Sequence, residues 1–426
     1  MDRFFGLIGL VVILGIAYLM SSNRKAIDRR LVISGLLLQL GMAVFILKTS
    51  LGQALFGTLG RWITKLLEFA DQGASFVFGF IVNKDLLDKV FGPGNSFVFM
   101  FKIMPTIIFV AVLVSIAYHI GLMQRIVSFF AKIMLKIMNV SGAEALSNVS
   151  SAFVGQVEAQ IMIKPYLSSM TMSEILASMT GSMACIAGGV MAIYISMGVP
   201  ANLLLAASLM AAPAALVISK IVLPETEPSQ TKGEVKLEVK KSHSNIMDAI
   251  SHGAGDGLKI SLNVIAMLIG VIALIALIDF LLGKFGMMMC NLTDSVSFLG
   301  MDLRTFSLKE ILGSIFSVFA WVMGVPSSDT HLAGQLLGTK LAVNEFVAYS
   351  DLTGMMASGA LSPKTLTIVS IACCGFANFS SIAIQVGGIG ELAPSRRSDL
   401  AKLGFKALLC GTLASYLSAT IAGILV

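Results

Sequence analysis

Long apolar runs, each about as long as a membrane-crossing helix, recur along the chain. A bilayer core of about 30 Å requires about 20 mostly apolar residues in helical form. We therefore predict about eight membrane-spanning helices. They cover residues 4–23, 31–47, 97–118, two consecutive spans within 175–219, and then 260–278, 364–386 and 406–426. The 175–219 stretch contains no Asp, Glu, Lys, Arg or His, and residues 198–200 (Gly-Val-Pro) mark its turn.

The segments between these spans indicate how the chain is oriented. A basic cluster at residues 24–30 follows the first span, and basic residues stay on the cytoplasmic side of a membrane. The long hydrophilic stretch 224–244 and the pair Arg396-Arg397 fall on the same side. Residues 52–95 mix apolar and charged positions, which is typical of amphipathic helices lying at the outer interface.

Two segments do not have the pattern of ordinary spans. Residues 145–163 have the length of a span but are crowded with Ser, Asn, Gln and Glu. Polar groups at membrane depth normally face protein or a wet cavity, so a re-entrant hairpin is predicted here. Residues 311–325 are apolar, 326–329 break the run, and a semi-polar arm follows from 330 to 340. This second segment is also predicted to be a hairpin.

The two hairpins belong to a layout that occurs twice. Glu158 closes the first hairpin and Glu345 follows the second, and each is followed by an apolar span interrupted by small or polar residues, at 187–189 and at 375–378. A hairpin, an acid and a broken helix in each half are typical of an inverted-repeat secondary transporter. The alternative is that both acids are structural residues, hydrogen-bonded inside a helix bundle.

We therefore predict an all-α polytopic membrane protein, with two re-entrant hairpins in an inverted repeat. The predicted parts are N-terminal scaffold helices with outer interfacial helices at 1–125, a first transport repeat at 126–222, a cytoplasmic linker at 223–246, a scaffold helix at 247–300 and a second transport repeat at 301–426.

Composition excludes several other classes of protein. Hydrophobic residues make up 56% of the chain and charged residues 13%, too few for a water-facing surface of ordinary composition. The net charge of +6 sits in short blocks between apolar runs, which favours orientation signals over nucleic-acid binding. The five cysteines show neither metal-ligand nor disulfide spacing. No Gly-rich phosphate loop is present, so ATP-driven transport is not expected.

The side chains expected around the two acids indicate the kind of solute. They are rich in hydrogen-bond donors and acceptors, and one is aromatic: Gln156, Glu158, Asn344, Glu345, Phe376, Asn378 and Ser381. No Lys or Arg is expected at the midplane, which argues against a strongly anionic substrate. A neutral, polyhydroxylated and partly flat solute suits this set better.

Three stretches carry a family resemblance. They are Val154-Gly155-Gln156-Val157-Glu158-Ala159, Ala342-Val343-Asn344-Glu345-Phe346-Val347-Ala348-Tyr349 and Cys374-Gly375-Phe376-Ala377-Asn378-Phe379-Ser380-Ser381. Together and in this order they resemble the signature stretches of concentrative nucleoside transporters, of the bacterial nucleoside permease type, over essentially the whole chain.

The resemblance implies cation-coupled uptake of nucleosides across a bacterial cytoplasmic (inner) membrane. It also implies a homotrimer in which each protomer moves a transport domain against a scaffold, as an elevator. Carried onto this chain, it places Gln156 and Glu158 at the nucleobase and Phe376 in the pocket wall. Glu345, Asn378 and Ser381 would hold the ribose.

The chain departs from the family pattern at two places. Val157 stands where sodium-coupled members have a threonine, which removes a hydroxyl from the base-facing side of the site. A sodium site carried over from the family would use Ser151, Cys185 and the carbonyls of Val154 and Ile186. A thiol is a poor sodium ligand, so the coupling ion is H+ or Na+, and protons are favoured, carried by Glu158 or Glu345. No organic cofactor is expected.

Other functions remain open at this stage. A proton-coupled carrier of nucleobases or nucleoside-like solutes would use the same site. A membrane-embedded hydrolase needs a positioned nucleophile or metal, which the sequence does not offer, so an enzyme is not expected. A channel needs a ring-forming selectivity motif, and none is apparent.

Overall fold

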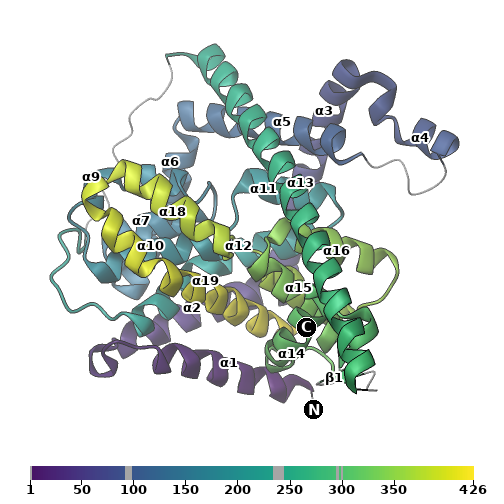
Figure 1. The fold of residues 1–426 in the computed structure, drawn as a ribbon. Coiled ribbons are helices and arrows are strands. Elements are labelled where there is room, and N and C mark those ends of the chain that lie inside the picture. Colours follow the sequence, from purple (N-terminus) through teal and green to yellow (C-terminus); the bar gives the residue numbers. More distant parts are fainter. Residues whose placement is uncertain (1, 92–97, 234–243, 294–296, 299–300) are drawn as a thin grey trace.

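The computed structural model describes residues 2–91, 98–233, 244–293, 297–298 and 301–426. Within these ranges the chain is helical, apart from a two-residue antiparallel ladder between β1 (Ser297–Phe298) and β2 (Met301–Asp302). Figure 1 shows the helices in chain order, with the long α13 crossing the front of the molecule and α3 and α4 projecting from it.

The N-terminal part consists of long helices. They are α1 (Asp2–Leu19), η1 (Arg24–Ala26), α2 (Arg29–Lys48), α3 (Ser50–Phe78), η2 (Gly79–Val82), α4 (Lys84–Phe91) and α5 (Phe99–His119). Asp28 begins α2, because its carboxylate accepts hydrogen bonds from the backbone amides of Arg30 and Leu31. The amphipathic segment predicted at 52–95 begins as one 29-residue helix, α3, with large apolar side chains such as Trp62 exposed.

A first series of helices follows. It contains α6 (Leu122–Met138), α7 (Gly142–Ser151), α8 (Glu158–Ile161), α9 (Lys164–Leu167), α10 (Met172–Ala184), α11 (Gly188–Ser196) and α12 (Ala201–Val222). The hairpin predicted at 145–163 is formed by α7, the turn 152–157 and the short helices α8 and α9. Capping boxes at Ser141/Glu144 and Thr171/Glu174 fix the starts of α7 and α10.

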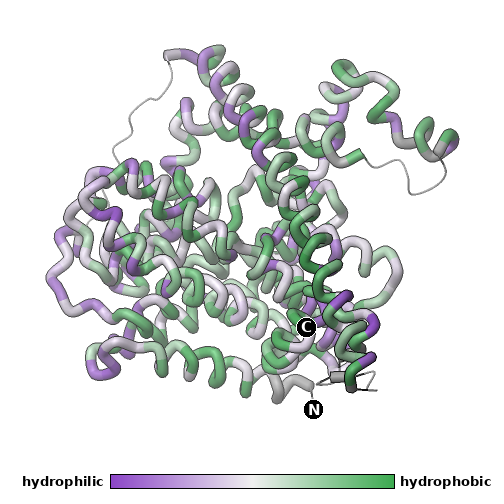
Figure 2. Tube along the Cα trace, viewed as in Figure 1, coloured by the Kyte–Doolittle hydropathy of each residue, from purple (hydrophilic) through white to green (hydrophobic). Residues whose placement is uncertain are grey.

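The helix α13 (Ile246–Thr293) is much longer than the span predicted at 260–278. Hydrophilic positions lie near both of its ends and hydrophobic ones between them, as Figure 2 shows. No proline interrupts residues 246–293, so the helix continues beyond the apolar run on both sides.

A second series of helices repeats the order of the first. It contains η3 (Leu303–Thr305), α14 (Leu308–Val322), α15 (Thr330–Ala342), α16 (Glu345–Ala357), α17 (Pro363–Ala372), α18 (Phe379–Leu392), η4 (Pro394–Arg396) and α19 (Arg397–Leu425). In each series a long helix precedes a hairpin, a helix broken at its centre and a final long helix. This repeated order agrees with the predicted two-half layout.

The second hairpin lies later in the chain than the predicted segment 311–340. The segment 311–340 does form two helices joined at 326–329, namely α14 and α15. Glu345, however, begins a third helix, α16, after a further break at 343–344, just as Glu158 begins α8. The counterpart of the first hairpin is therefore the pair α15 and α16. The break was missed because neither Gly nor Pro marks it; Asn344 restarts the helix by accepting a hydrogen bond from the amide of Val347.

Six described helical stretches are long and apolar enough to cross a membrane. They are Arg29–Lys48, Met100–His119, Met172–Ser196, Ala201–Val222, Ile246–Leu292 and Pro394–Leu425, with Gly6–Leu19 as a shorter apolar helix. The predicted seventh span is the broken pair α17 and α18. In an 18-residue apolar window of the stretches at 201–222 and 394–425, 78% and 83% of the residues are buried, whereas only 6% are buried in the corresponding window of 246–292. The core of this multi-pass membrane protein therefore lies around α12 and α19, and α13 lies at the periphery.

Candidate functional site

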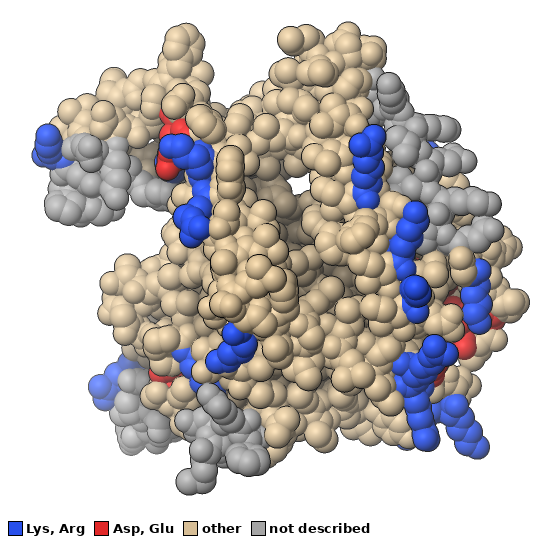
Figure 3. All heavy atoms as spheres, turned by 180° about the vertical axis from the view of Figure 1, so that it is seen from behind, with Lys and Arg blue, Asp and Glu red and all other residues tan. Residues whose placement is uncertain are grey.

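A large cavity separates the peripheral helices from the two hairpin-containing series. Its volume is about 1390 Å³, and α5 and α13 line it on one side. The turn 153–158, the start of α11 and the junction of α18 with α19 line the other side. Its polar lining residues include Ser115, Tyr118, Gln124, Gln156, Glu158, Lys164, Asp256 and Asn263. From the side opposite to Figure 1, the surface is hollowed near its middle (Figure 3).

The cavity reaches residues that the charge pattern assigns to the cytoplasmic side. Tyr118 ends α5, Gln124 begins α6, and Ser395 lies beside the basic residues between α18 and α19. Asp256 lies in the early turns of α13, which follows the hydrophilic linker. Ala187 and Phe376, one from each helix break, also line the cavity. The cavity thus connects the predicted cytoplasmic side to the breaks.

The turn of the first hairpin contributes Gln156, Val157 and Glu158 to the cavity wall. Glu158 is exposed, and its carboxylate folds back over Gly155, so that a side chain at 155 would require this flexible carboxylate to move. Val157 packs against Gly388 of α18, which has room for it only because 388 is a glycine. The turn is therefore shaped as much by these close approaches as by the residues that face the cavity.

The two helix breaks touch each other. The amide of Phe376, from the second break, donates a hydrogen bond to the carbonyl of Cys185, from the first, at 3.3 Å. A Cβ atom at Gly375 would lie 2.6 Å from the carbonyl oxygen of Ala184, so only glycine allows this approach. The amide of Gly188 also donates to the carbonyl of Phe153 in the hairpin turn. Both repeats therefore meet where the helices are interrupted.

A buried polar group is centred on Glu345. Its carboxylate accepts hydrogen bonds from the Tyr194 hydroxyl at 3.1 Å and from the Asn378 amide at 3.0 Å. Asn378 also begins α18, because its side-chain oxygen accepts from the amide of Ser381. Glu345, Asn378 and Ser381 are between 1% and 6% exposed, as is Asn344, which begins α16. These side chains are held in place by burial and by hydrogen bonds within the protein.

The structure thus sorts the predicted site residues into two groups. Gln156, Val157, Glu158 and Phe376 line the cavity. Asn344, Glu345, Asn378 and Ser381 are buried behind it. Besides the packing of Val157 against Gly388, a hydrogen bond joins the first group to α18: Gln385 donates from Nε2 to Gln156 Oε1 at 3.4 Å.

Sequence reasoning missed three residues of this region. Tyr194 is fully buried and donates a hydrogen bond to Glu345. The sequence offered one indication of this role, because Tyr194 is the only tyrosine in the uncharged stretch 175–219. Gln385, also fully buried, had no comparable signal. Lys340 is fully buried at the end of α15, five positions before Glu345 in the chain, whereas no lysine was expected near the site. The sequence pattern did not single out Lys340, because it lies at the end of the predicted semi-polar arm 330–340.

The residues of the candidate ion site lie on segments that the structure brings side by side. Ser151 ends α7, Val154 is in the hairpin turn, and Cys185 and Ile186 form the break after α10. All four are buried. The Ser151 hydroxyl donates to the carbonyl of Ser147 at 2.9 Å and lies 3.0 Å from the hydroxyl of Ser182.

A closed network of side chains surrounds Ser151. The Gln160 amide donates to the hydroxyls of Ser147 and Ser182 at 3.1 and 2.8 Å, and its oxygen accepts from Ser178 at 2.6 Å. These hydroxyl groups are fully or almost fully buried between the hairpin and α10. Their hydrogen-bonding capacity is used largely within the protein, which leaves few free oxygen atoms for a metal ion.

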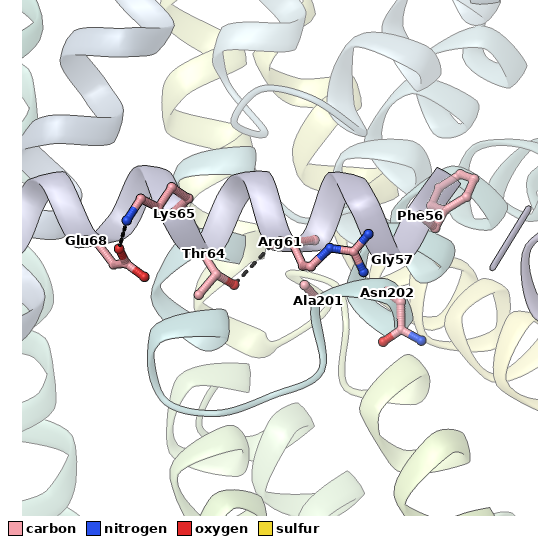
Figure 4. Close-up of a pocket in the computed structure, with 9 residues that line it drawn as sticks. Phe56, Gly57, Arg61, Thr64, Lys65, Glu68, Ala201 and Asn202 are labelled. Atoms are coloured by element: carbon pink, nitrogen blue, oxygen red, sulfur yellow. Dashed lines mark hydrogen bonds and ion pairs between the residues drawn. The ribbon is translucent and has the colours of Figure 1, made fainter. Parts of the chain in front are cut away.

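A second, smaller hollow of about 480 Å³ lies between α3 and the start of α12. Figure 4 shows Arg61 above Ala201 and Asn202, and the ion pair between Lys65 and Glu68 farther along α3. Gly60 allows α3 to approach Ala201 closely. This hollow shares no lining residue with the large cavity.

Apolar spanning helices around a cavity that ends at two broken helices define a membrane transport protein. Family patterns described as "Na+ dependent nucleoside transporter" match the chain at 8–81 (N-terminus) and 203–423 (C-terminus), and one described as "Nucleoside recognition" matches 100–201. The chain belongs to the Na+ dependent nucleoside transporter family. This is a family of transporters, not of enzymes, and it confirms the resemblance identified from the motifs.

Individual relatives are similar over their whole length. The chain is 41% identical to the uncharacterized transporter YutK of Bacillus subtilis, with all of both chains covered. It is 37% identical to the nucleoside permease NupC of Helicobacter pylori, over 99% of this chain and 97% of that protein. A solved structure, CNTnw in an inward-facing substrate-bound state, matches with a TM-score of 0.91 at 38% identity, covering 100% of this chain and 98% of the other.

Proposed function

We propose that this protein takes up nucleosides across a bacterial cytoplasmic membrane, driven by the gradient of a coupled cation. The observation that carries the proposal is the meeting of the two helix breaks beside the cavity, which Gln156, Glu158 and Phe376 line. Glu345 and Asn378, in the second repeat, are buried and hydrogen-bonded to each other. Broken helices at membrane depth leave backbone groups that a solute can satisfy. Family membership supports nucleosides as that solute.

Each part of a nucleoside has a plausible partner among these residues. The amide of Gln156 and the carboxylate of Glu158 can read the hydrogen-bonding edge of a base, while Phe376 offers an aromatic face. Glu345, Asn378 and Ser381 suit the ribose hydroxyls, because a carboxylate and an amide can accept and donate to neighbouring hydroxyl groups. Asn344 would act by setting the start of α16, and Val157 by limiting what the base side of the site accepts.

Transport would proceed by alternating access. The cavity reaches the predicted cytoplasmic side, so this conformation corresponds to an inward-open state of the proposed cycle. Repeats 126–222 and 301–426 would move together, since their breaks are joined by the contact of Phe376 with Cys185. Segments 1–125 and 247–300 would form the scaffold, and 223–246 the linker. The exposed apolar surface of α13 would face lipid or neighbouring protomers of a homotrimer.

Of the two coupling ions, the surroundings of Ser151 favour protons. Its hydroxyl is already bonded to Ser147 and Ser182, and Cys185 offers sulfur where sodium requires oxygen. The carboxylates of Glu158 and Glu345 can each carry a proton. A carrier of nucleobases coupled to protons is the second candidate, because the base side of the site lines the open cavity whereas Glu345 is buried.

The test is uridine uptake into proteoliposomes that hold the purified protein, with sodium and proton gradients imposed separately. We expect accumulation driven by the proton gradient, and none with Glu345→Gln. Competition by uracil as strong as that by uridine would favour the nucleobase carrier. Accumulation that persists in Glu345→Gln would overturn the assignment of the ribose site.

A further inference from the structure

Asp256 and Asn263 are polar side chains of the peripheral helix α13, and both line the large cavity. Ile260, which lies between them, lines it too, and this spacing of three to four residues places all three on one face of the helix. Both polar side chains are exposed, and neither forms a hydrogen bond or ion pair within the part of the chain that the structure describes. Their hydrogen-bonding groups are therefore available to a molecule in the cavity.

Asn263 lies in an apolar stretch of the chain. Within residues 260–278 the only other polar side chain is Ser261, which is buried and donates a hydrogen bond to the carbonyl of Gly257 at 2.7 Å. The hydroxyl of Ser261 is thus used within the helix, whereas the amide of Asn263 is not. A polar group at membrane depth is costly in lipid and typically marks the pathway of a solute or an ion. The position of Asn263 on the cavity wall agrees with such a pathway.

The wall that carries these residues is a close pair of helices, α13 and α5. A Cβ atom at Gly257 would lie 2.6 Å from the Cα atom of Ile108, so the two backbones approach each other closely there. The hydroxyl of Ser115, on α5, also donates to the carbonyl of Ala249, on α13, at 2.7 Å. Both helices belong to the segments assigned to the scaffold, so Asp256 and Asn263 stay in place while the repeats move.

The cavity has room for a solute at this wall. Sites for one small ligand usually have volumes of about 300–1,000 Å³, whereas this cavity measures about 1390 Å³. Gln156 and Glu158 line it from the opposite side, on the turn of the first hairpin. A nucleoside held by the moving repeats would therefore fill only part of the space.

The chemistry of the two side chains suits an uncharged solute rich in hydroxyl and amide groups. The carboxylate of Asp256 accepts hydrogen bonds, and the amide of Asn263 both donates and accepts. Seven residues of helix separate them, which is about 10 Å along the axis and comparable to the length of a base with its sugar. We infer that Asp256 and Asn263 form a second subsite for the nucleoside, on the scaffold, between the moving site and the cytoplasm.

This inference rests on the proposed function and adds a direction to it. The subsite can hold a solute only while the cavity is open to the cytoplasm, because the moving repeats must then face α13. It assists release into the cytoplasm and loading from it. Loading from the outer side takes place in a conformation in which this part of the cavity is closed, so the subsite does not contribute to it.

The first test is protection of a cysteine placed between the two residues. Ile260→Cys, in a protein whose Cys290 is replaced by Ser, is treated with a small methanethiosulfonate reagent with and without saturating uridine. We expect uridine to slow labelling severalfold, also in the Glu345→Gln background, in which the moving site is impaired. Combining Asp256→Asn with Asn263→Leu should abolish the protection.

Ser395→Cys is the matched control, because it lines the same cavity from the junction of α18 with α19. Uridine should leave its rate of labelling unchanged. Equal slowing at both cysteines, absence of protection at 260, or protection that survives the loss of both polar side chains would overturn the inference. If the parent protein does not accumulate uridine, the proposed function fails and the subsite with it. A protein that transports uridine without protecting 260 loses the subsite alone.

The second test compares transport in the two directions. Loss of one hydrogen bond changes an equilibrium constant by about threefold to tenfold. Asn263→Leu should therefore raise the KM for uridine by this factor in inside-out membrane vesicles and leave it unchanged in right-side-out vesicles. Leu262→Ala, an exposed neighbour outside the cavity lining, should change neither value. An equal rise in both directions, or no rise in either, would show that Asn263 has only a structural role.

Discussion

Tyr194 and Glu345, 151 positions apart in the chain, are joined by a hydrogen bond of 3.1 Å from the tyrosine hydroxyl to carboxylate Oε1. Tyr194 belongs to the second half of the broken helix in the first repeat, and Glu345 begins a helix of the second. The carboxylate assigned to the ribose is thus oriented by the opposite repeat, which makes the site dependent on how the two repeats pack.

Tyr194→Phe should therefore weaken nucleoside binding without removing the carboxylate. Hydrogen bonds to charged groups contribute about 1.5–3 kcal/mol, so we expect the KM for uridine to rise about tenfold or more. Tyr349→Phe is the control, because Tyr349 stacks against Tyr194 but donates its hydrogen bond to the carbonyl of Ser370. An unchanged KM in Tyr194→Phe, or an equal rise in both variants, would show that the contact with Glu345 does not matter for binding.

Val157→Thr should change base preference. The two side chains have nearly the same shape, so packing against Gly388 is kept, while a hydroxyl group is added on the side assigned to the base. We expect a shift in the relative inhibition of uridine uptake by cytidine and adenosine, with little change in melting temperature. Val157→Ile adds bulk without a hydroxyl and serves as the comparison. The same shift in both variants would mean that size, not hydrogen bonding, sets the preference.

Cys185→Ser should increase the dependence of uptake on sodium. It replaces a thiol with a hydroxyl in the break beside Ser151, and oxygen is the ligand that sodium prefers. The measurement is uridine uptake in proteoliposomes over a range of sodium concentrations at fixed pH. Cys410→Ser, another buried cysteine but located in α19, should leave the sodium dependence unchanged. Identical sodium curves for Cys185→Ser and the parent protein would exclude an ion site at this break.

The direction of the cavity can be tested by chemical labelling. Four of the five cysteines are buried, so replacing Cys290 leaves a background of low reactivity. Ser395→Cys, at the mouth of the cavity, should react with a membrane-impermeant maleimide only from the cytoplasmic side. Arg61→Cys, at the smaller hollow on α3, should react only from the outer side. Labelling of both positions from one side would show that the predicted orientation is wrong.

Gly375→Ala should disrupt the contact between the two breaks. The added methyl group would lie 2.6 Å from the carbonyl oxygen of Ala184, and overpacking of this kind costs about 1–3 kcal/mol. We expect a lower melting temperature together with loss of uptake. Gly387→Ala in α18 has open space around it and should be tolerated. Normal uptake by Gly375→Ala would mean that the breaks need not touch during transport.

Much of this architecture could be predicted because membrane insertion imposes strong rules on sequence. Apolar length located most of the long apolar helices, although the one predicted at 260–278 extends over 246–293, and the polar crowding at 145–163 located the first hairpin. The motifs around Glu158, Glu345 and Asn378 identified the family that the comparisons confirm. These features are local, so they can be recognised in a single sequence.

What could not be predicted depends on contacts between distant segments. The break at 343–344 contains neither Gly nor Pro, and its function as a helix start is visible only from the bond between Asn344 and Val347. Lys340 lies in the predicted semi-polar arm, and only the structure shows that its side chain is fully buried. Hydropathy describes the average surroundings of a segment, whereas these residues are defined by their particular neighbours.

The packing of α1 against α19 also has a consequence for how the protein is made. Gly6 lies against Ile424, so two helices separated by almost four hundred positions of the chain pack against each other. During synthesis α1 must remain in the bilayer without this partner until α19 has been translated. Packing of α1 against α19 is therefore a late event, and a substitution that disrupts α19 should also destabilise the position of α1.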